Sequence, residues 1–219
     1  GEQVSNLCLG AMYFGSKNDE ATSYQILDQY VHAGGTFIDT ANIYATWFEG
    51  HHGGDSEKLL GKWMQERNNR DQLFIASKVG FDYQDVPISL DPKIIEEECH
   101  KTLERMGIET IDLYYCHKDD RDTPIEASME ALNRLVEAGK VRHIGASNYM
   151  AWRLEQARWV SETHDWAQFS CVQQRHTYLP IRPQADVGRQ VVANEDLQDY
   201  CENTNTTLLA YSALLGGAY

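Results

Sequence analysis

Four residues whose side chains can act together on a carbonyl group stand at or just after the ends of short apolar runs: Asp39, Tyr44, Lys78 and His117. A phenol with a pKa of about 10 is a poor acid at neutral pH, and a neighbouring ammonium lowers that pKa because it favours the phenolate. Lys78 can supply the ammonium, Asp39 can hold Lys78 in place, and His117 can donate a hydrogen bond to an oxygen that gains negative charge. The set suits protonation of a carbonyl oxygen while hydride arrives from elsewhere.

Each of these residues also fits a structural role when it is taken alone. Lys78 and Asp39 can form a buried ion pair, and His117 can be a core histidine with its hydrogen bonds satisfied. Asp39 can instead cap the next turn, with Tyr44 packed on the surface. Their occurrence together, at the ends of successive strands, favours the functional interpretation.

The elements that must position these residues are short apolar strands alternating with amphipathic helices, a pattern typical of parallel βαβ units. Strands are expected at residues 7–12, 36–38, 73–79, 111–117, 141–148, 169–173 and 206–211. Helices are expected from Asn18, after Asp55, from an N-cap at Asp91 to Gly107, from a capping box at Thr123–Glu126 to Gly139, around Trp152, and from Asn194 to Glu202.

Two α/β architectures fit this alternation, an open doubly wound sheet and a closed (β/α)8 TIM barrel. The second to sixth strands end in Asp, Lys, His, Ser-Asn and Gln, and a barrel takes its catalytic groups from the carboxyl ends of several strands. A doubly wound sheet more often carries G-x-G-x-x-G after its first strand, and that motif is absent. We therefore expect a barrel. Since a barrel normally takes about 250 residues, we expect residues 1–219 to be a single barrel domain that covers about seven strands and lacks its C-terminal part.

The composition and charge limit the classes of molecule that the chain is expected to bind. The chain is 42% hydrophobic with a net charge of −14, a balance that repels nucleic acid and anionic membranes. An anionic cofactor would need a local positive site. The sequence shows neither a membrane span nor a secretory leader, which favours a cytoplasmic location. The five cysteines are widely spaced and are expected to be reduced and mostly buried.

Several segments resemble the signature segments of the aldo-keto reductases: FIDTANIY, GGDSEKLLG, LFIASKVG, IDLYYCHKDD, GKVRHIGASN and LLAYSALLGG. The resemblance implies that Tyr44, Lys78, Asp39 and His117 are a catalytic tetrad in which Tyr44 donates the proton. It also implies NAD(P)H-dependent reduction of an aldehyde or ketone to an alcohol, with a small-molecule carbonyl or alcohol as substrate and NADPH (NADP) as the expected cofactor.

The resemblance further implies a set of cofactor-binding residues. Ser147, Asn148 and Gln173 would hydrogen-bond the nicotinamide carboxamide, and Tyr211 would stack on its ring. The rest of the set lines the cofactor's other side or begins the loop over the pyrophosphate, and Asp39 belongs to it as well: Gly10, Ala11, Met12, Asp39, Ser212, Leu214 and Gly216. The family segment that binds the adenosine phosphate follows the eighth strand, so the preference for NADPH over NADH is implied only by the resemblance. Neither oligomeric state nor physiological substrate follows from the sequence.

Two features depart from the family pattern. Arg175 stands two residues after Gln173, where a glutamate is common, and Ala45 follows Tyr44 where glycine is common. The loop from Ala45 to Asp55 is long and aromatic, and we predict that it shapes the substrate pocket with Trp47 against the substrate. No metal is expected at His51, His52 and Asp55, because neighbours on one loop rarely converge on one ion.

Two other functions compete with the reductase hypothesis. One is a nicotinamide-binding regulatory subunit with slow or vestigial catalysis, since the family also includes channel-associated β subunits. The other is a metal-dependent barrel hydrolase, which the absence of a ligand cluster disfavours.

Overall fold

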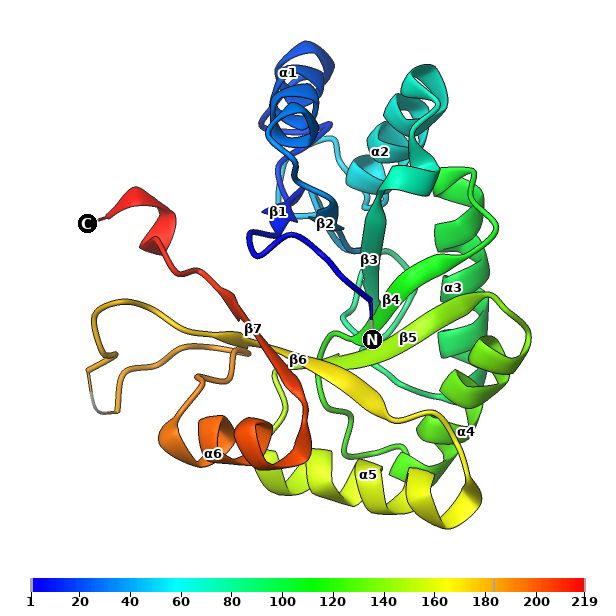
Figure 1. Cartoon of the computed structure of the whole chain (residues 1–219), viewed down its shortest axis with the longest axis vertical. Coiled ribbons are helices and arrows are strands. Elements are labelled where there is room, and N and C mark those ends of the chain that lie inside the picture. The colour runs from blue at the N-terminus through cyan, green and yellow to red at the C-terminus, as the bar shows by residue number, and fades with distance from the viewer. Residues whose placement is uncertain (1, 183, 219) are drawn as a thin grey trace.

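Seven parallel strands form one sheet in the sequential order β1-β2-β3-β4-β5-β6-β7 in the computed structural model, which describes residues 2–182 and 184–218. The strands are β1 (Leu9–Gly10), β2 (Phe37–Asp39), β3 (Phe74–Val79), β4 (Ile111–Cys116), β5 (Val141–Ser147), β6 (Phe169–Arg175) and β7 (Thr207–Tyr211). The sheet curls, and the helices lie along its outer side (Figure 1). Sequential order with curling is the arrangement of a (β/α)8 barrel over seven strands, which confirms the predicted fold class.

Six α-helices connect the strands: α1 (Glu20–His32), α2 (Asp55–Arg67), α3 (Pro92–Met106), α4 (Ile125–Glu137), α5 (Ala151–His164) and α6 (Glu195–Thr204). Short 3-10 turns lie at Arg70–Gln72 and Leu215–Gly217. The predicted cap of α3 is confirmed, because the Asp91 side chain accepts from the backbone N of Lys93 at 2.9 Å and Pro92 is the first helical residue. No helix among the described residues is both long and apolar enough to cross a membrane.

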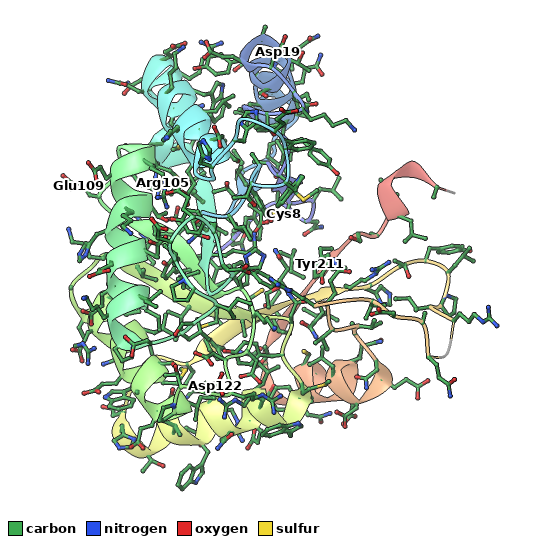
Figure 2. The ribbon with its side chains drawn as sticks, turned by 180° about the vertical axis from the view of Figure 1, so that it is seen from behind. Cys8, Asp19, Arg105, Glu109, Asp122 and Tyr211 are labelled. Atoms are coloured by element: carbon green, nitrogen blue, oxygen red, sulfur yellow. The ribbon has the colours of Figure 1, made fainter. Side chains whose placement is uncertain are left out.

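The strands separate an outer core from a smaller inner one because their side chains alternate between faces. The outer core packs residues such as Ile38, Ile75 and Tyr114 against the helices. The inner core consists of Phe37, Ala76, Leu113, Tyr115 and Cys171. Two residues further along β2, β3 and β6, on the same inward face, stand Asp39, Lys78 and Gln173. The inner core is therefore an apolar layer. Asp39, Lys78 and Gln173, here called the polar layer, lie directly on its carboxyl-end side. Figure 2 shows the side chains from behind, with Tyr211 toward the middle of the molecule.

Close approach inside the sheet explains Gly145 on β5. A Cβ at this position would lie 2.7 Å from the ring of Tyr115 and 3.0 Å from the carbonyl oxygen of Cys171. The register between β5 and β6 also shifts between Ile144 and Gly145. A side chain here would force β4 and β6 apart.

Three local predictions were wrong. The first strand is only two residues long, and Leu7 is exposed. The capping box at Thr123 does not form, because α4 begins one residue later, with Pro124 as its N-cap and no side-chain cap hydrogen bond, and Thr123 Oγ1 instead donates to Asp120 Oδ2 at 2.7 Å. The sixth strand extends to Arg175 rather than ending at Gln173, which places Arg175 inside the ladder.

Candidate active site

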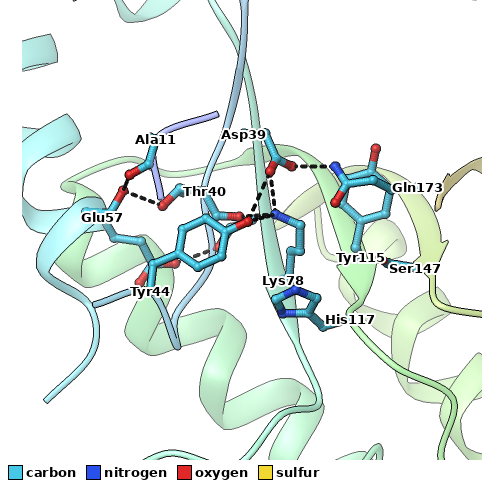
Figure 3. Close-up of polar contacts among 12 residues, drawn as sticks. Ala11, Asp39, Thr40, Tyr44, Glu57, Lys78, Tyr115, His117, Ser147 and Gln173 are labelled. Atoms are coloured by element: carbon cyan, nitrogen blue, oxygen red, sulfur yellow. Dashed lines mark hydrogen bonds and ion pairs between the residues drawn. The ribbon is translucent and has the colours of Figure 1, made fainter. Parts of the chain in front are cut away.

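Lys78 is the centre of the polar layer. Its ammonium, fully buried on β3, donates to Asp39 Oδ2 at 2.5 Å, to the carbonyl oxygen of Thr40 at 2.7 Å and to Tyr44 Oη at 2.9 Å (Figure 3). An ammonium has three N–H donors, so all three have acceptors. Burial tends to lower the pKa of Lys78, but Asp39 and Tyr44 outweigh it and the net shift is upward. Lys78 therefore stays a cation.

Asp39 joins two distant parts of the chain. Its Oδ2 receives Lys78, while its Oδ1 accepts from Gln173 Nε2 of β6 at 3.0 Å (Figure 3). Tyr44 Oη also points at Oδ2, at 3.4 Å, a long and therefore weak hydrogen bond. Both oxygens of the buried carboxylate are thus satisfied, which fixes the side chains on which Lys78 and Tyr44 depend.

The phenol of Tyr44 is less acidic than the sequence suggested. Burial raises its pKa to about 12, and the nearby Lys78 ammonium lowers it without overcoming burial. The predicted direction of the Lys78 effect holds, but the predicted net result, a lowered pKa, is wrong because the desolvation of the phenolate is larger. Tyr44 is accordingly protonated at neutral pH and has a proton to give.

His117 follows β4 and faces the same space. Its ring centroid lies 6.2 Å from that of Tyr44 and 4.6 Å from that of Phe81. Burial, and to a smaller extent Lys78, holds the pKa of His117 well below its ordinary value, so the imidazole is neutral at physiological pH. Nδ1 is buried and has no hydrogen-bond partner among the described residues.

A cavity of about 840 Å³ opens above this layer. Most of the predicted site residues line it: Gly10, Met12, Asp39, Tyr44, Trp47, His117, Ser147, Asn148, Gln173, Tyr211 and Ser212. Lys78 lies behind the wall, with no exposed surface. Three predicted cofactor residues are not in the wall. Ala11 is buried, and its carbonyl accepts from Ser56 Oγ at 2.8 Å; Leu214 and Gly216 lie at the C-terminal 3-10 turn, with Leu214 exposed.

Asn148 is bound to the protein on both ends of its amide. Its Nδ2 donates to the carbonyl oxygen of His117 at 2.9 Å and to Ser147 Oγ at 3.1 Å. Its Oδ1 accepts from Tyr211 Oη at 2.7 Å and from the backbone N of Val191 at 3.1 Å. Asn148 has a left-handed backbone, with φ of 58°, which Asn tolerates better than most residues. It ties the ends of β4, β5 and β7 together at the cavity.

The loop after β2 carries Tyr44 and is anchored from both sides. Asn42 Nδ2 donates to the buried Glu98 Oε2 of α3 at 2.8 Å, and Thr40 Oγ1 hydrogen-bonds Ser56 Oγ at 2.8 Å. Trp47 extends from this loop, about half exposed, with its ring centroid 6.2 Å from that of Tyr44. The aromatic loop therefore contributes Trp47 to the rim of the cavity.

The family model described as "Aldo/keto reductase family" matches residues 6–219. The chain belongs to the aldo/keto reductase family. It is 33% identical to a norsolorinic acid reductase of Emericella nidulans over 100% of this chain and 56% of that protein. An aryl-alcohol dehydrogenase [NADP(+)] of Phanerodontia chrysosporium is 34% identical over 72% of this chain and 44% of its own length. An uncharacterized oxidoreductase of Bacillus subtilis is 35% identical over 88% and 63%. The chain spans about half the length of the curated relatives it matches.

Part of the cavity wall was missed in the sequence analysis. The additional lining residues are Tyr13, Ile43, Phe81, Arg175, Asp186, Val187, Arg189 and Gln190. Four of them come from the segment after β6, which crosses toward β3 where Arg189 pairs with Asp82 at 2.6 Å. The sequence held one signal for these missed residues, Arg175, which departs from the family pattern by placing a positive charge where a glutamate is common.

The residues present fit a nicotinamide cofactor on three observations. The cavity volume lies within the range of ligand pockets. Gly10 presents bare backbone, since a Cβ there would meet no atom within 4 Å. His117 Nδ1 is a buried polar atom without a partner among the described residues. Gly10, Ser147, Asn148, Gln173 and Tyr211 are the residues that would hold the group.

Proposed function

We propose that the protein is an NADPH-dependent reductase of aldehydes or ketones, with Tyr44 as the proton donor. The observation that supports it most is the contact between Tyr44 Oη and the buried ammonium of Lys78, at 2.9 Å in the wall of the cavity. A bare ion pair between Lys78 and Asp39 would not need a phenol beside it. NADPH is preferred in the proposal because a relative is named for NADP(+).

A bound nicotinamide would supply the hydride. The chain's own residues would then handle the proton and the charge. Tyr44 is protonated at neutral pH, and it delivers its proton to the carbonyl oxygen as that oxygen becomes an alkoxide. Its long contact with Asp39 is weak enough for the hydroxyl hydrogen to turn toward the substrate.

Once the proton has left, Lys78 stabilises the phenolate. The ammonium is already in place and needs no rearrangement, which is the condition for effective electrostatic stabilisation. Asp39 keeps Lys78 charged and aimed. His117, neutral and beside Tyr44, donates a hydrogen bond to the carbonyl oxygen of the substrate. In the reverse direction the same residues accept the proton of an alcohol.

Mixing the protein with NADPH and a panel of aldehydes, and following the absorbance of the reduced nicotinamide, tests the proposal. We expect oxidation of NADPH to match formation of alcohol, faster than with NADH. Binding of NADPH with no turnover on any aldehyde would instead support a regulatory subunit, and turnover abolished by a chelator would support a metal-dependent enzyme.

A further inference from the structure

Arg175 stands one step beyond the proposed catalytic layer on the same face of β6. Side chains two residues apart share a face, so Arg175 follows Cys171 and Gln173 inward, roughly 7 Å beyond Gln173 along the strand. It pairs in register with Tyr211 of β7 and lines the cavity with it. A positive charge is therefore built into the wall at the carboxyl end of β6.

No carboxylate of the described residues neutralises this charge. Arg175 Nη1 donates to the neutral Gln190 Oε1 at 2.5 Å, while its Nε is buried and has no partner among residues 2–182 and 184–218. The other arginine of the cavity wall, Arg189, is paired with Asp82. Asp186, also in the wall, accepts from the backbone N of Gly188 at 2.7 Å.

A half-buried guanidinium without a counter-ion is electrostatically costly. That cost becomes binding free energy when an anion with two acceptor oxygens arrives, because a guanidinium matches carboxylate and phosphate in a fork of parallel hydrogen bonds. The need for such a local charge is large here, since a net charge of −14 repels anions from the molecule as a whole.

We propose that Arg175 binds an anionic oxygen group, a carboxylate or a phosphate, of a molecule held in this cavity. The inference deepens the proposed function, on which it rests for the identity of that molecule. The group has two sources, the phosphates of the nicotinamide cofactor or an acid group on the carbonyl substrate.

Equilibrium binding separates the two sources without relying on turnover. Titration calorimetry would measure NADPH, inorganic pyrophosphate, para-carboxybenzaldehyde and the neutral para-methylbenzaldehyde on the wild-type chain, Arg175→Gln and Arg175→Lys. Arg182→Gln is the matched control, because it removes the same charge from the segment after β6 at an exposed residue outside the cavity wall.

If the source is the substrate, Arg175→Gln lowers the affinity for para-carboxybenzaldehyde on the order of tenfold and leaves the affinities for para-methylbenzaldehyde and NADPH unchanged. If the source is the cofactor, the affinities for NADPH and pyrophosphate fall by a similar factor, and the affinities for both aldehydes do not change. Arg175→Lys recovers part of the loss in either case, and Arg182→Gln shows none.

Unchanged binding of all four probes in Arg175→Gln, or an equal loss in Arg182→Gln, overturns the proposal. Should Arg175→Gln fail to fold, the wild-type chain decides. The proposal then predicts that para-carboxybenzaldehyde binds more tightly than para-methylbenzaldehyde, or that pyrophosphate competes with NADPH. If neither result is seen, the proposal is overturned. Charge-dependent binding without any turnover would sink only the reductase proposal, whereas turnover with charge-independent binding would sink only this one.

Discussion

Ser77 and Lys78 are neighbours on β3, yet they serve two different buried clusters. Lys78 points inward to Asp39 and Tyr44 at the cavity. Ser77 points outward and donates to Glu57 Oε1 of α2 at 2.6 Å, where Thr102 at 2.9 Å and Arg105 at 2.5 Å also converge. Both clusters bury a carboxylate paired with a cation. They differ in that the inner one places a phenol, which can give a proton, in the wall of a cavity. The outer one joins α2, α3 and β3, and the member of it that lines a cavity is Arg105, which has no proton to give at neutral pH.

The difference shows that burial and pairing do not by themselves mark a catalytic group. Glu57 has no exposed surface and its charge is fully paired, and its position explains only how the helices are held to the sheet. What distinguishes the inner cluster is Tyr44, which is protonated at neutral pH and lines the cavity, where a bound molecule could reach it.

Lys78→Met should have the largest effect. Removing the ammonium leaves Asp39 buried without its counter-ion, which costs about 3 kcal/mol of unfolding free energy, and removes the charge that stabilises the phenolate. We expect aldehyde reduction to fall by about a hundredfold to ten-thousandfold. Steady-state kinetics alongside urea denaturation would measure both effects, and retention of wild-type turnover would contradict the assigned role.

Glu57→Gln should cost stability without costing catalysis. It leaves the half-buried Arg105 without its counter-ion, so we expect a loss of about 3 kcal/mol in unfolding free energy, comparable to that of Lys78→Met. The turnover number of the folded protein should stay near wild type. A drop in turnover as large as that of Lys78→Met would mean that the two clusters are not functionally distinct.

His117→Asn should change how stability depends on pH. The pKa of His117 is held well below its ordinary value of 6.5 in the folded protein, so below about pH 6.5 the unfolded chain binds a proton that the folded chain does not. Stability should therefore fall with decreasing pH by at most about 1.4 kcal/mol per pH unit from this residue, and the variant should lack that part of the slope. Denaturation at several pH values measures it, and identical slopes would contradict the pKa direction.

Trp47→Ala should have the smallest effect. Its ring adds an edge contact near Tyr44, and loss of one aromatic contact is worth about 1 kcal/mol, or about fivefold in KM for an aromatic aldehyde. A small aliphatic aldehyde should be unaffected. An unchanged substrate range would show that the aromatic loop does not shape the pocket.

The sequence predicted the strands and the polar residues at their carboxyl ends because both depend on local patterns. Alternation places Asp39, Lys78 and Gln173 on one face, and each strand could be recognised from a short apolar run. It could not predict contacts made across the barrel mouth, such as that between Arg189 and Asp82, which are 107 residues apart. Nor could it weigh burial against charge at Tyr44, because desolvation depends on the finished packing. The failed capping box at Thr123 has the same origin, since the Thr123 side chain is oriented toward Asp120 and α4 begins one residue later than predicted.

A matched pair of tyrosine variants tests the central claim most directly. Tyr44 and Tyr83 are both hydrogen-bonded, but Tyr44 is half-buried in the cavity wall, whereas Tyr83 is buried, donates to Glu98 and does not line the cavity. We predict that Tyr44→Phe lowers the rate of aldehyde reduction by about a hundredfold to ten-thousandfold with NADPH binding retained, and that Tyr83→Phe keeps a rate near wild type. Equal rates in Tyr44→Phe and the wild type would contradict the assignment of Tyr44 as the proton donor.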